Sequence, residues 1–84
     1  MFEFTYELYG EKLKGFADYF VSQQTGKFIV NLHHGYIVIG PMHKMKKNTR
    51  IIWIQFPTYR FKKQSDEMIQ ALGEGIIAGG FLVY

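Results

Sequence analysis

Residues 27–39 read KFIVNLHHGYIVI, and this stretch decides the fold. Every second side chain from 28 to 32 is apolar, which is the pattern of a strand with one buried face. His33-His34-Gly35 predicts a tight turn, and the apolar run over 36–39 predicts the returning strand. Residues 27–39 are therefore expected to form a β-hairpin. Gly40-Pro41 should end it, because proline has no N–H to give to a sheet ladder.

Two flanking stretches predict further strands of the same sheet. Phe2 to Tyr9 alternates apolar and polar residues, with the apolar side chains on one face, and Gly10 ends it. Arg50 to Phe56 has the clearest strand pattern of the chain, and Pro57 breaks it. We expect the face of this strand that carries Ile52, Ile54 and Phe56 to enter the core. The other face then carries Ile51, Trp53 and Gln55.

Helical spacing occurs twice. Ser65 followed by Asp66 and Glu67 is an N-cap with acids in the first turn, and Gly79-Gly80 is a helix stop. The apolar positions between them predict a buried helix face made of Met68, Ile69, Leu72, Ile76 and Ile77. Between residues 12 and 24 a helix is favoured over a strand, since helical spacing collects the apolar residues Leu13, Phe16, Ala17, Phe20 and Val21.

These elements predict one domain over residues 1–84. Its fold class is α+β, a curved antiparallel β-sheet of about four to five strands with one or two helices packed on one face.

Charge is distributed in blocks along the chain. Residues 1–18 carry four acids and two lysines, residues 19–65 carry eight basic residues and no acid, and residues 66–84 carry three acids and no base. A stretch of 47 residues without a carboxylate points to a polyanionic partner more strongly than the net charge of +3 does. The other interpretation is that strands from the acidic flanks pair beside the basic ones and neutralise them.

The basic middle also contains aromatic residues, and the combination favours binding of single-stranded nucleic acid. Bases stack on exposed rings while lysine and arginine side chains follow the phosphates. The candidate binding residues are Tyr36, Lys44, Lys46, Lys47, Arg50, Trp53, Tyr59, Arg60, Lys62 and Lys63. The stacking part of this prediction requires an exposed Trp53. A helix over that face of the sheet would instead make Trp53 part of the core.

Other kinds of site find little support in the sequence. Imidazole suits transition metals, but adjacent histidines such as His33 and His34 usually point apart, and no acid lies near them or His43. A histidine pair with a lysine could serve a nuclease, yet only residue type supports that. Gly73-Glu74-Gly75 lies inside a predicted helix, whereas a phosphate loop precedes one. We therefore expect no enzyme activity, no metal site and no cofactor.

Three features that the sequence lacks indicate the cellular compartment of the protein. There is no cysteine, which fits a reducing cytosol, and the N-terminus lacks the basic region and apolar run of a signal peptide. The longest apolar run, residues 76–84, has about half the length that a membrane-spanning helix needs. A cytoplasmic protein without a membrane segment is expected.

Four short motifs carry a family resemblance. They are Phe16-Ala17-Asp18, Phe28-Ile29-Val30, the run over 35–39 and the run over 53–59. Together, over residues 13–62, they resemble the SpoVG family of small dimeric bacterial proteins that bind nucleic acid. The resemblance implies the same activity here and requires 13–21 to be a strand. Two features depart from the family: the longer spacing between the first and last motifs, and the basic residues that replace the strand expected after Pro57.

The sequence thus favours a small non-enzymatic protein that binds single-stranded DNA or RNA as a homodimer. Dimerisation is expected because a small sheet leaves edge strands that need cover, and Phe81–Tyr84 is the candidate strand. The alternative is a small protein-binding module or inhibitor, of the kind that mobile elements encode, whose basic surface meets an acidic partner protein.

Overall fold

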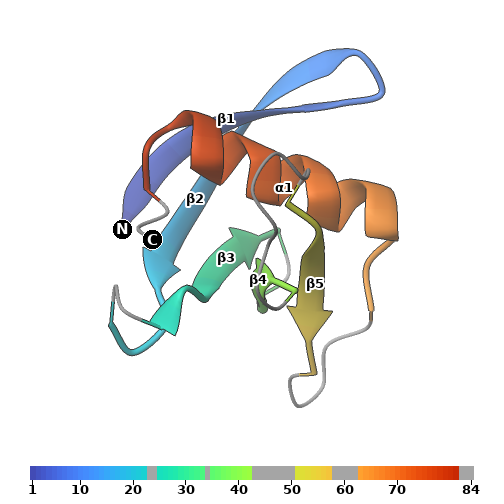
Figure 1. Ribbon diagram of the computed structural model, residues 1–84. Helices are drawn as coiled ribbons and strands as arrows, with labels where there is room; N and C mark the ends of the chain where they lie inside the picture. Colours follow the sequence, from blue (N-terminus) through green and yellow to red (C-terminus); the bar gives the residue numbers. More distant parts are fainter. Residues whose placement is uncertain (23–24, 34, 43–50, 58–62, 82–84) are drawn as a thin grey trace.

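The computed structural model is a five-stranded antiparallel sheet with one helix packed against it (Figure 1). The structure describes residues 1–22, 25–33, 35–42, 51–57 and 63–81. Its elements are β1 (Phe2–Leu8), β2 (Glu11–Tyr19), β3 (Phe28–Leu32), β4 (Gly35–Pro41), β5 (Trp53–Phe56) and α1 (Asp66–Ala78). The sheet order β1-β2-β3-β4-β5 follows the chain, so each strand pairs with the next one. The predicted α+β fold class is confirmed.

The hairpin predicted for residues 27–39 is confirmed as β3 and β4, but it does not end at Gly40. Gly40 and Pro41 still pair with β5, opposite Ile54 and Trp53. Proline is tolerated at position 41 because a backbone N–H is not needed there. Met42 N–H points to β5 and donates to Ile52 O at 2.7 Å, and since successive N–H groups of a strand alternate in direction, the missing N–H of Pro41 would point to the β3 side. β3 does not extend that far, because its first residue, Phe28, lies opposite Ile39.

The helix predicted within residues 12–24 is wrong, since residues 11–19 form strand β2. It pairs with β1 from Phe2–Ala17 to Leu8–Glu11. Tyr9 and Gly10, at φ 53° and 78°, make the two-residue connection that such hairpins favour. The helical spacing was misleading because β2 carries apolar side chains on both of its faces. Pairing with a neighbouring strand then outweighs the local pattern.

The core lies between the sheet and α1. Its largest fully buried side chains come from β3, β4 and the helix, namely Phe28, Ile37, Ile39, Ile69, Leu72, Ile76 and Val30. As predicted, Ser65 caps the helix, its Oγ accepting from Met68 N–H at 3.2 Å, and Gly79 ends it. Phe81 follows the helix and stacks on Phe2 with ring centroids 3.9 Å apart. The candidate strand Phe81–Tyr84 otherwise lies outside the described residues.

Two glycines let α1 lie deeply between the edge strands β1 and β5. A Cβ at Gly73 would overlap the indole of Trp53 on β5. A Cβ at Gly75 would lie 2.5 Å from Thr5 O on β1. Figure 1 shows the helix crossing the space between these two strands. The glycines therefore mark the positions where helix backbone approaches both edges of the sheet.

Gln70 completes the cover of the β5 edge. Its Oε1 accepts from Trp53 N–H at 3.0 Å, and its Nε2 donates to Ile51 O at 2.7 Å. The side-chain amide thus satisfies backbone groups that a further strand would otherwise pair with. α1 thus contacts the edge strand β5 at Gln70 and the edge strand β1 at Gly75. At these two positions the edges are already covered, so the argument that uncovered edge strands favour a dimer does not apply there.

The orientation predicted for β5 is also wrong. Trp53 is 4% exposed and lies under α1, whereas Ile52 is 44% exposed. The strand is apolar on both faces, so alternation alone could not orient it. The flat surface that Gly73 leaves on the helix accommodates the indole, and this contact decides which face enters the core.

None of the helices in the described part of the chain is long and apolar enough to cross a membrane.

Candidate nucleic-acid interface

The side of the sheet that faces away from α1, here called the open face, carries a straight row of residues across four strands. Register pairs Glu3 with Phe16, Phe16 with Asn31, and Asn31 with Tyr36. Directly opposed residues point to the same face of a sheet. Phe16 is 41% exposed and Tyr36 is 54% exposed, so two aromatic rings from alternate strands are open to solvent in one row. Asn31, also exposed, lies between them.

The neighbouring row of the open face is mostly apolar. It runs from Asp18 through Ile29 and Val38 to Phe56. Val38 is buried although it points away from the helix, and Lys27 Nζ lies 4.4 Å from the centroid of the Phe56 ring. This row gives the open face an apolar floor with a cation at one end.

The carboxylates near Phe16 are each paired with a cation. Asp18 Oδ1 lies 2.7 Å from the N-terminal ammonium of Met1, and Glu3 Oε2 lies 3.9 Å from Lys14 Nζ. These pairs are exposed and individually weak. They nevertheless reduce the repulsion that these two acids would exert on a bound polyanion.

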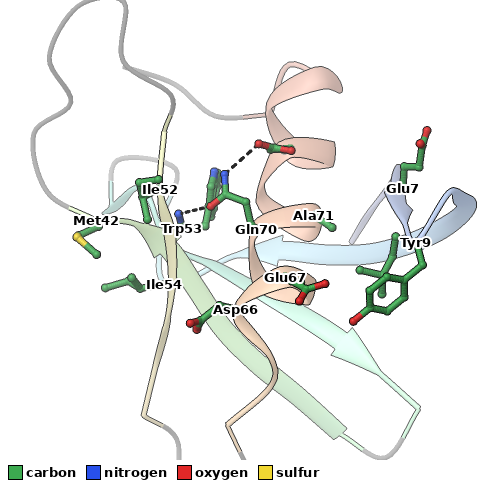
Figure 2. A pocket seen from close by; sticks show the side chains of 12 residues that line it. Glu7, Tyr9, Met42, Ile52, Trp53, Ile54, Asp66, Glu67, Gln70 and Ala71 are labelled. Atoms are coloured by element: carbon green, nitrogen blue, oxygen red, sulfur yellow. Dashed lines mark hydrogen bonds between the residues drawn. The ribbon is translucent and has the colours of Figure 1, made fainter.

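The surface beside α1, along the edge strand β5, has a different character. A hollow of about 540 Å³ beside α1 is bordered by the carboxylates of Glu7, Asp66, Glu67 and Glu74 (Figure 2). Gln70 lies among them and bonds both Glu74 and the backbone of Trp53. The remaining lining residues are uncharged, namely Leu8, Tyr9, Met42, Ile52, Trp53, Ile54 and Ala71. A hollow with this lining repels a polyanion, so among the described surfaces the open face is the better candidate for one.

The predicted site residues fall into three groups. Tyr36 and Lys63 are exposed, Tyr36 on the open face and Lys63 shortly before α1. Trp53 is buried under the helix, and its ring cannot offer a face to a base as the structure stands. The others lie outside the described residues: Lys44, Lys46, Lys47, Arg50, Tyr59, Arg60 and Lys62.

Phe16 is the residue that sequence reasoning missed. Read as a strand, the segment places Phe16 on the polar face between Lys14 and Asp18. Contiguous exposed apolar patches mark binding surfaces, and an aromatic residue on the solvent side of a strand can contribute to such a patch. This contribution was hidden by the helical interpretation, in which Phe16 belongs to the buried stripe.

Comparisons of the chain with protein-family models, with curated proteins and with solved structures find no match. Among the described residues, no group of three or more histidine, aspartate or glutamate side chains is placed to hold a metal ion.

Proposed function

We propose that this protein binds single-stranded nucleic acid on the open face of its sheet. The observation that carries the proposal is the row in which Phe16 and Tyr36 stand exposed on alternate strands. This face lies on the side of the sheet away from α1, whose acidic residues border the hollow. Exposed rings on a sheet are stacking platforms for unpaired bases, and each stacked base contributes about 1–3 kcal/mol.

The charge pattern of the sequence supports the same partner. The acid-free stretch 19–65 has eight basic residues, and all of them lie in connecting segments of the sequence: one directly before β3, four between β4 and β5, and three between β5 and α1. The acidic residues of segments 1–18 and 66–84 are not distributed evenly over the molecule. Four of them border the hollow, and Glu3 and Asp18 are paired with cations. The basic side chains are therefore proposed to contact the phosphates while the two rings hold bases.

The test measures the affinity of a labelled mixed-sequence single strand of 12 nucleotides by fluorescence anisotropy over a range of salt concentrations. Neutralising phosphates releases counterions, so log affinity should fall with log salt by about 0.7 per phosphate contacted. The triple variant Lys44→Ala, Lys46→Ala, Lys47→Ala should bind more weakly and flatten this slope by about two units.

Stacking is tested separately with Tyr36→Thr, which keeps a strand-forming residue in β4. We expect a loss of about 1–3 kcal/mol with little change in the salt slope, because no phosphate contact is removed. Tyr9→Asn is the matched control. It removes a tyrosine that is more exposed than Tyr36, at 78% against 54%, from the border of the hollow, and it should leave affinity unchanged.

Absence of salt-sensitive binding by the wild-type protein would overturn the proposal. So would equal losses in Tyr36→Thr and Tyr9→Asn. If the lysine variant binds the strand as the wild type does, the basic segment has another partner, and an acidic protein becomes the leading candidate.

A further inference from the structure

The spacing of the two exposed rings restricts the kind of strand that can use both. Phe16 and Tyr36 flank the same residue, Asn31, one from β2 and the other from β4. They are therefore two strand spacings apart, which is about 10 Å for neighbouring strands about 4.8 Å apart.

Neighbouring bases of a stacked strand do not match this spacing. Successive nucleotides of such a strand rise by about 3.4 Å, so neighbouring bases cannot reach two rings that are about 10 Å apart, and bases further inside the stack have both faces covered by their neighbours. If one base lies on Phe16 and a neighbouring one on Tyr36, the stack between them must open. Opening a base step costs free energy, and the cost is smaller for pyrimidines, whose single rings overlap less than the fused rings of purines.

The region between the rings is suited to an opened step. Asn31 is exposed there, and its amide offers two N–H donors and a carbonyl acceptor to base edges that are no longer stacked. Lys14 lies two residues before Phe16 on the same face of β2 and is paired with the exposed carboxylate of Glu3, at 3.9 Å. Such a pair exchanges readily for a phosphate.

From this geometry we infer that the open face selects weakly stacked, pyrimidine-rich single strands over stacked purine strands. The inference rests on the proposed function, since it names the ligand of the same surface. It also makes the selectivity a property of two rings acting together. With one ring removed, a base can bind without opening a step, and the selectivity should disappear.

The experiment compares oligo-dT and oligo-dA, both of 12 nucleotides, with the wild-type protein and with the variants Phe16→Thr and Tyr36→Thr. Wild-type protein should bind oligo-dT about tenfold more tightly than oligo-dA, as expected if opening a purine step costs about 1.4 kcal/mol more. Each variant should bind oligo-dT more weakly, and the ratio of the two affinities should approach one. Circular dichroism melting of each variant confirms that it is folded, and Tyr9→Asn should retain the wild-type ratio.

The outcomes separate the two proposals. Binding of both strands with equal affinity would overturn the selectivity while leaving the proposed function in place, as would a dT-to-dA ratio that survives removal of either ring. Tighter binding of oligo-dA would also overturn it. Absence of binding to either strand would refute the proposed function itself.

Discussion

Replacing Gly73 with alanine should destabilise this protein, although the same change stabilises an ordinary exposed helix. In an exposed helix interior, alanine is favoured over glycine by about 1 kcal/mol because it restricts the unfolded backbone more. At Gly73 the added Cβ would overlap the Cγ, Cδ2 and Cε2 atoms of Trp53. The indole is 4% exposed and cannot turn out into solvent without emptying part of the core.

The helix cannot move aside freely either. On its other side Gly75 packs on β1, where even a Cβ would lie 2.5 Å from Thr5 O. Only movement away from the sheet relieves the overlap, and this opens the contacts of Ile69, Leu72 and Ile76 with the core. Overpacking of this kind costs about 1–3 kcal/mol, and an overlap with a whole ring belongs at the upper end. After the intrinsic gain of alanine, the net loss should be about 1–2 kcal/mol.

Urea unfolding followed by circular dichroism measures this loss as a lower midpoint at constant slope. In a chain of 84 residues the melting temperature should fall by about 4–8 °C per kcal/mol. Ala78→Gly, at an exposed position of the same helix, is the control and should lose only about 1 kcal/mol, from propensity. In a Trp53→Leu background the overlap is absent, so Gly73→Ala should become neutral or stabilising. A Gly73→Ala protein more stable than the wild type, or an equal loss in both backgrounds, would refute the contact between helix and indole.

Two further predictions concern the edge of the sheet and the start of the helix. Gln70→Leu leaves Trp53 N–H and Ile51 O without their side-chain partner, so the free energy of unfolding should fall by about 1–3 kcal/mol. Light scattering should detect concentration-dependent association through the uncovered edge of β5, whereas a stable monomer would show that Gln70 is dispensable. Ser65→Ala should cost about 1 kcal/mol in thermal melts while Ser65→Asp stays near wild type, and an equal loss in both would contradict the capping role.

Elements with complete local patterns could be predicted from the sequence. The strand at Phe2–Leu8 has clean alternation, the hairpin of β3 and β4 has a turn between two apolar runs, and α1 has a serine cap and a glycine stop. In β1 and α1 one face is apolar and the other polar, so the period of the pattern identifies both the element and its orientation. In the hairpin the turn between the two apolar runs identifies the element.

Prediction failed in two strands that carry large apolar side chains on both faces. β2 has Leu13 and Ala17 on one face and Phe16 on the other, which imitates a helical stripe. β5 has Trp53 on one face and Ile54 and Phe56 on the other, so either orientation satisfies alternation. What decides β5 is the space left by Gly73, which is 20 positions away in sequence. Long-range shape complementarity of this kind has no local signature.

The candidate site was predicted in part for the same reason. Tyr36 lies in a strand that was predicted correctly, and it is exposed on the open face as the stacking hypothesis requires. Trp53 and Phe16 lie in the two strands with ambiguous faces, and their roles were exchanged. The ring expected at the surface is in the core, and a ring expected in a buried stripe is at the surface.

This exchange of roles follows from the position of the helix. Because α1 lies between β1 and β5, it takes Trp53 into the core and carries Asp66, Glu67 and Glu74 to the border of the hollow. The acidic C-terminal block is thereby placed on one side of the sheet, and Phe16 and Tyr36 are left uncovered on the other. On that other side, Glu3 and Asp18 are paired with Lys14 and the N-terminal ammonium. The position of the helix therefore places three acids away from the two exposed rings, and this arrangement supports the proposal of a polyanionic partner for the open face.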